Sequence, residues 1–203
     1  MPWYRPAERA PTTWLAMKTV VHLVVLWGVG LYLLPRAIVI WQRDVDLHAL
    51  FFEPQHELAI GVMAVASAIS FWSAMLLAVA GRGTPARVDA PRHLVITGPY
   101  AWVRNPMVVC GLAQGVAVAL YTGSVLIFLL VLVAGVLWHL IRRKDEEKDL
   151  QRVFGRNYEL YRRSVRCWMP QRRRWAPAEP EAAISAQTLR QEMGRQRRRR
   201  RRR

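Results

Sequence analysis

The stretch that decides the fold is MVVCGLAQGVAVALYTGSVLIFLLVLVAGVLWHL, residues 107–140, which contains no Asp, Glu, Lys or Arg. An α-helix crosses a hydrocarbon core of about 30 Å with roughly 20 apolar residues, because each residue adds about 1.5 Å. These 34 residues are therefore too many for one crossing. The short segment Tyr121-Thr-Gly-Ser124 carries the turn-forming residues of the stretch. The pattern predicts a helical hairpin that turns there.

The two arms of this hairpin are short for a membrane crossing. Their apolar parts, about 14 and 16 residues, reach only about 21 and 24 Å. Either the arms extend into the flanking polar segments, or they form a shallow hairpin buried against other helices. In the first arm Gly111, Gly115 and Ala119 recur at every fourth residue, which would let a second helix approach closely on that face. Alternatively, the pattern only reflects how common small residues are in membrane helices.

Two further apolar runs precede the hairpin. The first predicts a helix from about Trp14 to Leu34, which Pro35 ends or kinks. It lacks a small-residue cleavage site, so a retained helix is favoured over a signal peptide. The second run, Leu58 to Ala80, has no charged residue and predicts another membrane helix.

The charges are distributed unevenly along the chain. Residues 142–203 hold 21 Lys and Arg against 8 Asp and Glu, and the loop 81–106 has a net charge of +3. The segment 42–57 has a net charge of −3. Because positively charged loops stay on the cytoplasmic side, both termini and the loop 81–106 are expected there, with 42–57 outside.

These observations predict an all-α integral membrane protein with four transmembrane helices, a long cytoplasmic loop and a C-terminal amphipathic helix. Three regions are expected: N-terminal membrane helices in 1–80, a functional core in 81–170 and a tail in 171–203. Cys110 and Cys167 form neither a disulfide framework nor a metal-binding spacing, so no metal is expected.

Beyond the hairpin the sequence changes character. Apolar residues recur at intervals of three and four between arginines, which predicts a basic amphipathic helix or pair of helices on the inner leaflet or against the loop 81–106; they are Leu150, Val153, Phe154, Tyr158, Tyr161 and Val165. The tail ends in Arg197–Arg203, and such a run is expected to be disordered. It could contact anionic lipid or bind nucleic acid non-specifically, and no specific nucleic acid is expected.

The loop 81–106 is rich in glycine and proline, yet it also contains apolar anchors, which favours an ordered loop. It ends in GPYAWVRNP, residues 98–106, and the hairpin brings this end close to Asp145-Glu-Glu147. Charged groups of both signs that converge from distant sequence suggest a binding site at the mouth of the bundle. In an alternative interpretation Tyr100, Trp102 and Arg104 only anchor the membrane interface, and the acidic residues only begin a solvated helix.

Several motifs together resemble one enzyme family. They are GPYAWVRNP (98–106), the glutamate pair Glu146-Glu147, and FGRNYELY (154–161) with Pro170 after it. In this order and at these separations, over residues 81–170, they are similar to the isoprenylcysteine carboxyl methyltransferase family and its bacterial members, which are related to phospholipid N-methyltransferases.

The resemblance implies a membrane methyltransferase (a transferase of class EC 2.1.1.-) that uses S-adenosyl-L-methionine to methylate a lipid-like or isoprenoid acceptor in the bilayer. Cofactor-binding residues carried over from the family are Gly98, Pro99, Tyr100, Arg104, Glu146 and Glu147, and catalytic ones are Arg104 and Asn105. The residue types suit the ligand, because Glu146 or Glu147 can pair with its ammonium group and Arg104 with its carboxylate.

Three positions depart from the family pattern: Asn105 stands in place of a histidine, Val108 of a tyrosine and Cys110 of a glycine. A carboxylate acceptor needs no general base, whereas an amine acceptor does, and His93 is a candidate for that role. The alternative function is a non-catalytic membrane adaptor, whose basic tail binds lipid or a partner.

Overall fold

The computed structural model describes residues 7–8, 10–44, 51–86, 89–171 and 175. These residues form helices joined by turns and loops, and they contain no strand. The all-α prediction is therefore confirmed for the described part of the chain. The run Arg197–Arg203 and the rest of the tail predicted to be disordered lie outside it, apart from residues 171 and 175.

The first helix is longer than the sequence suggested. It begins as α1 (Thr12–Trp27), widens into a π-helical segment η1 (Gly28–Leu33) and continues as α2 (Leu34–Asp44). The prediction that Pro35 ends a helix at Leu34 is wrong. Proline lacks the N–H that an α-helix needs. The wider turn directly before it, in which Leu34 N–H donates to the Val29 carbonyl, lets the helix pass this residue.

The second predicted helix is present as α3 (Gln55–Val79), which starts three residues earlier than expected. It packs between α1 and α4 (Pro106–Thr122). Three continuous helices are long and apolar enough to cross a membrane: Thr12–Arg43, Gln55–Val79 and Val125–Phe154. Because α4 is shorter than these, the count of four crossings and their orientation stay predictions.

The hairpin turns where the sequence predicts. Gly123, with φ +65°, ends α4, and the Ser124 side chain caps the next helix by accepting a hydrogen bond from Ile127 N–H. Glycine adopts this left-handed conformation without the steric cost that a Cβ brings. The first arm remains short.

The second arm of the hairpin extends far into the polar sequence. Helix α5 (Val125–Leu137) continues through the π-helical segment η4 (Trp138–Arg142) into α6 (Arg143–Phe154). The alternative in which an arm extends into polar sequence therefore applies here.

The basic segment after the hairpin folds as a pair of helices. Gly155, with φ +57°, separates α6 from α7 (Arg156–Ser164). Tyr158, Tyr161 and Val165 pack against Ile96 of the loop 81–106. The loop is ordered as expected over its described residues, and of the two placements predicted for the amphipathic segment the structure shows packing against the loop.

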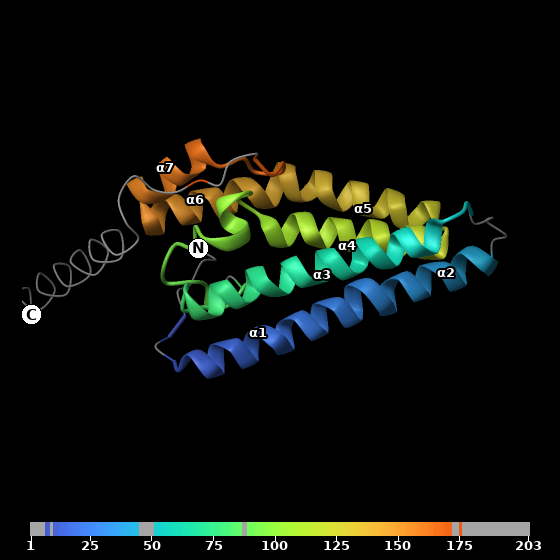
Figure 1. Ribbon diagram of the computed structural model, residues 1–203, viewed down its shortest axis with the longest axis horizontal. Coiled ribbons are helices and arrows are strands. Elements are labelled where there is room, and N and C mark those ends of the chain that lie inside the picture. The colour runs from blue at the N-terminus through green and yellow to red at the C-terminus, as the bar shows by residue number, and fades with distance from the viewer. Residues whose placement is uncertain (1–6, 9, 45–50, 87–88, 172–174, 176–203) are drawn as a thin grey trace, which may run out of the picture.

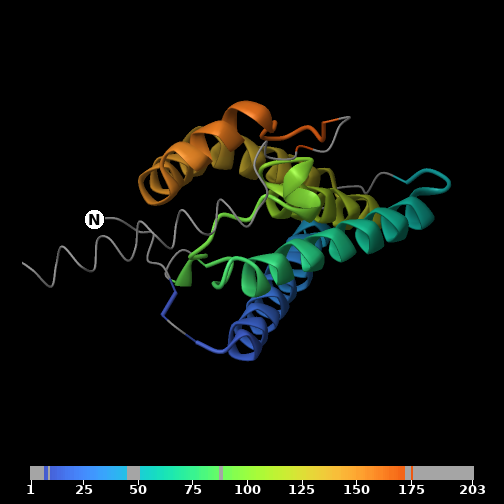
Figure 2. The same ribbon diagram turned by 60° about the vertical axis from the view of Figure 1, so that its left-hand side comes forward.

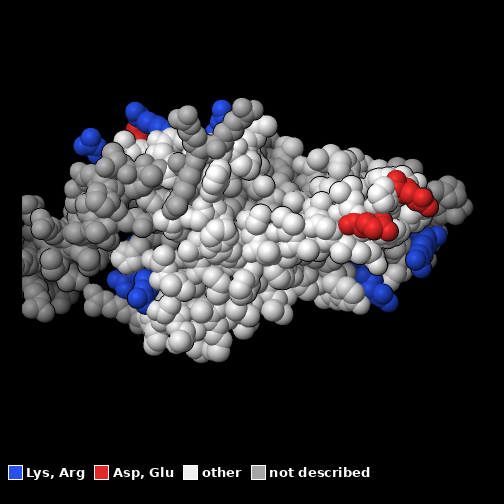
Figure 3. Space-filling view, in the orientation of Figure 1, with Lys and Arg blue, Asp and Glu red and all other residues white. Residues whose placement is uncertain are grey.

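Figures 1 and 2 show the long helices side by side, with α6 and α7 folded over the loop 81–106 at one end. On the face in Figure 3, charged side chains gather at the two ends, and the surface between them is uncharged. Such a distribution is typical of a bundle whose middle contacts lipid. Polar contacts inside the bundle fix the helices to one another: Gln114 Nε2 donates to Ser67 Oγ (2.9 Å), and Ser124 contacts Gln42.

Candidate active site

A cavity of about 400 Å³ lies at the end of the bundle where α6 and α7 cover the loop 81–106. Small-molecule sites occupy about 300–1,000 Å³. Leu26 of α1 and Leu77 of α3 form part of its apolar wall. Its charged side chains are Arg104 just before α4, Arg142 at the end of η4 and Glu146 of α6. We call this space the central cavity.

Arg104 reaches the central cavity from the residues just before α4. Its backbone N–H donates to the Arg166 carbonyl (2.9 Å), which fixes the start of the side chain. The side chain is 11% exposed. Its Nε is buried and has no hydrogen-bond acceptor among the described residues. A buried guanidinium N–H without an acceptor costs free energy, so the site is suited to an anionic oxygen that enters the cavity.

Glu147 is surrounded by guanidinium groups. Its Oε1 lies 3.1 Å from Arg104 Nη1 and 3.3 Å from Arg143 Nη1, and its Oε2 lies 3.6 Å from Arg162 Nη1. The contact with Arg104 is an ion pair by distance, but its angle does not make a hydrogen bond. Glu147 thus orients Arg104.

Glu146 occupies a different position from its neighbour. It lines the central cavity, whereas Glu147 does not. The sequence left open which glutamate would face a ligand, and the arrangement favours Glu146. Arg104 and Glu146 therefore present opposite charges to one space.

Three tyrosines form the buried aromatic part of the site. Tyr161 Oη donates to the Tyr100 carbonyl (2.7 Å), which joins α7 to the 3₁₀ turn η3 (Gly98–Ala101). Burial raises the pKa of Tyr100 well above its ordinary value, and the charges of Tyr161 and Glu146 add to this. Burial likewise raises the pKa of Tyr158 to about 12, and Glu147 adds to this while Arg104 opposes it. Burial also raises the pKa of Tyr161. All three are neutral phenols at physiological pH.

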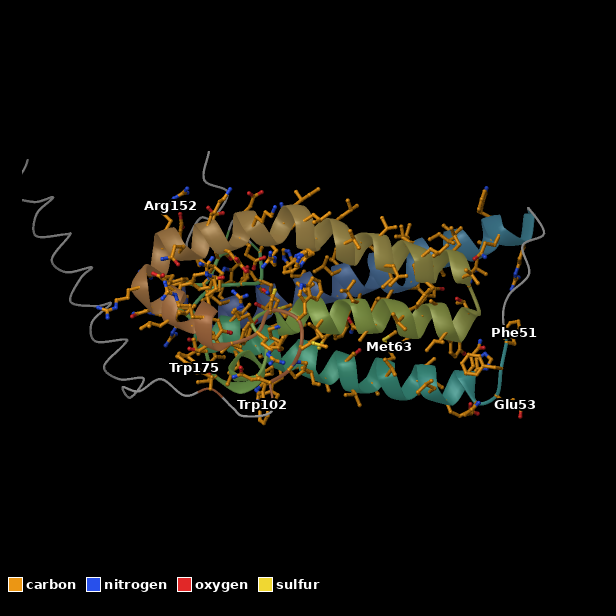
Figure 4. The ribbon with its side chains drawn as sticks, turned by 90° about the horizontal axis from the view of Figure 1, so that it is seen from above. Phe51, Glu53, Met63, Trp102, Arg152 and Trp175 are labelled. Atoms are coloured by element: carbon orange, nitrogen blue, oxygen red, sulfur yellow. The ribbon has the colours of Figure 1, made fainter. Side chains whose placement is uncertain are left out.

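The segment that follows α7 runs back along η3. Gln171 N–H donates to the Trp102 carbonyl (3.0 Å), and Trp175 N–H donates to the Ala101 carbonyl (3.1 Å). Figure 4 shows Trp102 and Trp175 at the same end of the molecule, opposite Phe51 and Glu53. These backbone contacts, with that of Arg104, hold the residues before α4 in place.

The other predicted site residues differ in position. Asn105 lines the central cavity, and its Nδ2 donates to Cys167 Sγ (3.3 Å). Gly98 and Pro99 are not among the lining residues. Gly98 has φ +57°, and a Cβ there would lie 2.6 Å from Leu76 Cδ1 of α3. The role of Gly98 is therefore structural: without a Cβ it adopts this backbone conformation and lets the turn η3 approach α3.

His93 and Val108 also line the central cavity. The tyrosine that Val108 replaces in the family pattern would stand there, so the departure changes the wall of the site. Cys110 is buried within α4 and is not among the lining residues.

Sequence reasoning assigned no site role to several lining residues, namely Trp138, Leu150, Phe154, Tyr158 and Tyr161. Four of them belong to the three- and four-residue spacing after the hairpin, or to the motif FGRNYELY. The inward face of that pattern is the signal that could have found them.

The central cavity combines a charged end with apolar walls. Such a site can bind a zwitterionic small molecule next to a hydrophobic one. A family model described as phospholipid methyltransferase matches residues 54–157, from the first turn of α3 into α7. No curated protein matched the chain by sequence.

Proposed function

The chain belongs to the phospholipid methyltransferase family, and from this premise we propose that it transfers a methyl group from S-adenosyl-L-methionine to a hydrophobic acceptor dissolved in the membrane. The observation that carries the proposal is the central cavity, in which Arg104 and Glu146 face one space beside apolar walls.

The residues fit this cofactor at its charged end. The buried Arg104 Nε, which has no acceptor among the described residues, would donate to the cofactor carboxylate. Glu146 would pair with the cofactor ammonium group. Glu147 would act as a positioning residue, because it holds Arg104 within 3.1 Å rather than facing the cavity itself.

When bound, S-adenosyl-L-methionine supplies an electrophilic methyl group on a sulfonium. The chain would contribute alignment and exclusion of water, which provide much of the rate in such displacements. Tyr100 would offer an aromatic face to the cation, and its neutral phenol brings no competing charge. Leu26, Leu77 and Val108 would contact the apolar acceptor.

The acceptor class is the finer part of the proposal. Leu26 belongs to a helix whose surface is largely exposed apolar side chains, so an acceptor would enter sideways from lipid. Membranes that contain the protein can be incubated with cofactor labelled on its methyl group and then extracted. A labelled amine would require a base to remove its proton, a role for which His93 lines the cavity, and a labelled carboxyl ester would not, since a carboxylate has no proton to lose. No labelled lipid of any class would contradict the proposed transfer.

Cofactor binding can be tested separately from transfer. Calorimetric titration of the detergent-solubilised protein with S-adenosyl-L-methionine is expected to show about 10- to 100-fold weaker binding in Arg104→Gln and in Glu146→Gln, because each loses a charge-assisted contact worth roughly 1.5–3 kcal/mol.

The matched control is Arg163→Gln, which removes an exposed arginine at the same end of the molecule. Its affinity is expected to equal that of the unmodified protein. Folding of each variant is checked by its thermal midpoint. Unchanged affinity in both Arg104→Gln and Glu146→Gln would remove the basis of the assignment.

A further inference from the structure

A second hollow lies at the opposite end of the bundle from the central cavity. It has a volume of about 670 Å³ and is bounded by η1, α2, α3 and α4 (Figure 1). None of its lining residues belongs to the central cavity. We call it the distal groove.

One face of the first long helix forms a wall of the distal groove. Its lining residues follow helical spacings of three and four, so they share a stripe; they are Tyr32, Pro35, Arg36, Val39, Ile40 and Arg43. Val39 and Ile40 lie between the two arginines, and Tyr32 and Pro35 lie on the N-terminal side of Arg36.

The opposite walls are made of small and apolar side chains. Ala59 and Ala64 of α3 and Ala117 of α4 leave room that larger residues would fill. Met63, labelled in Figure 4, lies on the same face of α3. Met63 and Leu31 pack on a buried cluster around Val118, so the floor of the groove is continuous with the protein core.

Arg36 and Arg43 are exposed, and among the described residues neither guanidinium forms an ion pair. Glu53, labelled in Figure 4, and Glu57 in the first turn of α3 lie at the same end of the molecule, and within the described part of the chain neither pairs with Arg36 or Arg43. Two guanidiniums at the rim of an apolar groove match the planar, bidentate hydrogen bonding of a phosphate.

The length of the helix puts Arg43 at the depth of the lipid headgroups and Arg36 at their boundary with the acyl chains. Thr12–Arg43 has 32 residues, which span about 48 Å at 1.5 Å per residue, against a hydrocarbon core of about 30 Å. The helix therefore extends past the acyl chains, and its last turns reach the phosphate layer. The apolar floor of the groove points back toward the acyl region.

We propose that the distal groove binds one phospholipid of the leaflet at this end, with its phosphate held by Arg36 and Arg43 and an acyl chain along Leu31, Met63 and Val118. This lipid is a structural ligand and not the methyl acceptor, because the groove shares no lining residue with the central cavity. The proposal is therefore independent of the proposed enzymatic activity.

The test uses the full chain, stripped of lipid in detergent, with native mass spectrometry to count bound lipid and a thermal shift to measure affinity. The probes are phosphatidylglycerol and diacylglycerol with identical chains, which differ in the phosphate-containing headgroup. Phosphatidylglycerol is expected to bind at least tenfold more tightly than diacylglycerol. The double variant Arg36→Gln/Arg43→Gln is expected to lose this preference.

Two further variants separate the groove from general charge and from folding effects. Arg152→Gln/Arg156→Gln makes the same charge change at the other end of the molecule, where both arginines are exposed, and should retain the preference. Ala64→Phe keeps both arginines but fills the groove, so it should weaken phosphatidylglycerol binding as well. Cofactor affinity in the groove variants is expected to match the unmodified protein.

Three results would overturn the proposal. They are equal affinity for the two lipids, equal loss in the groove and control arginine variants, and full phosphatidylglycerol binding by Ala64→Phe. A second copy of the chain could instead cover the groove. The unmodified protein would then be a dimer and the groove variants monomers in the native mass spectrum, and this result would also contradict lipid occupancy.

Discussion

Arg104 is held in place by contacts of both its backbone and its side chain. Its backbone is bonded to the Arg166 carbonyl, and its guanidinium lies beside Glu147. Glu147 in turn is shared with Arg143 of the same helix and Arg162 of α7, so three side chains from two helices set one guanidinium position. A preoriented guanidinium loses little conformational entropy when a carboxylate binds.

The raised pKa of Tyr158 predicts how the protein responds to alkaline conditions. Folding favours the neutral phenol, whose pKa rises from 10.0 to about 12. This contribution to stability is complete below pH 10 and is lost as pH rises toward 12, because the unfolded state then releases the phenol proton while the folded state still holds it. The thermal midpoint is expected to fall over this interval, and less steeply in Tyr158→Phe.

The control for this prediction is Tyr121→Phe, which changes an exposed tyrosine and should leave the slope unchanged. Thermal unfolding followed at several pH values between 9 and 12 measures it. An identical slope in Tyr158→Phe and the unmodified protein would show that other groups cause the alkaline loss.

The residue-scale pairing was predictable in part. The hairpin was expected to bring Arg104 near Glu146 and Glu147, and the 3.1 Å contact agrees with that. The sequence could not predict that Glu146 faces the cavity while Glu147 binds arginines. Arg162 reaches Glu147 because of the turn at Gly155, whose φ of +57° sets the direction of α7. The pairing of Asn105 with Cys167 likewise depends on this tertiary arrangement.

At the scale of elements, Pro35 illustrates a limit of sequence reasoning. Proline removes one backbone donor, and this loss is compatible with a helix end, a kink or a local change of helical pitch. The choice depends on the environment of the helix. Here the π-helical segment Gly28–Leu33 keeps the first long helix unbroken, and it thereby creates the wall of the distal groove.

The small residues of α4 give a sharp prediction about the hairpin. A Cβ at Gly115 would lie 2.6 Å from Val131 Cγ2 of α5, whereas a Cβ at Gly111 has no neighbour within 4 Å. Gly115→Ala is expected to destabilise the protein by roughly 1–3 kcal/mol through overpacking. Gly111→Ala is expected to be neutral or stabilising by up to about 1 kcal/mol, because alanine favours helix.

Thermal unfolding in detergent compares the two variants directly. Both variants replace a glycine of α4 by alanine, so the general effect of alanine on helix stability cancels when their midpoints are compared. Equal midpoints for Gly115→Ala and Gly111→Ala would mean that α4 and α5 pack less closely than the geometry indicates. The predicted face of small residues is thus borne out for Gly115 and not for Gly111.

At the scale of the whole molecule, the fold could be predicted where long apolar runs and a turn sequence agree. The helices of the bundle and the turn at Tyr121–Ser124 belong to this class. The contact between the loop 81–106 and α7 was named as one of two alternatives, because a basic amphipathic helix can lie on lipid or on protein. Only tertiary packing around Ile96 distinguishes them.

The two candidate functions differ in what they need from the tail. Residues 171 and 175 bond to the backbone of Trp102 and Ala101 beside the central cavity. Deleting residues 176–203 is expected to leave cofactor affinity unchanged, whereas deletion from residue 171 is expected to weaken it by about tenfold as the contacts on η3 are lost. Titration of both truncated proteins measures this.

An adaptor would respond in the opposite way. Its localisation or partner binding would be lost in the shorter deletion, and no methyl transfer would be found in either protein. Retained transfer without residues 176–203 therefore argues for the enzyme. Unchanged cofactor affinity after deletion from residue 171 would contradict the role given to residues 171 and 175.

The unbroken helix from Val125 to Phe154 has one mechanical consequence. Its 30 residues span about 45 Å, so a tilt of about 5° at the hairpin turn moves the other end by about 4 Å. Arg104 lies on a separate segment and is joined to this helix by its ion pair with Glu147. A tilt would therefore work against that contact and change the spacing between Arg104 and Glu146. Because bilayer thickness alters the tilt of membrane helices, cofactor affinity should differ between bilayers of short and long acyl chains. Equal affinities across such bilayers would mean that helix tilt does not change the spacing between Arg104 and Glu146.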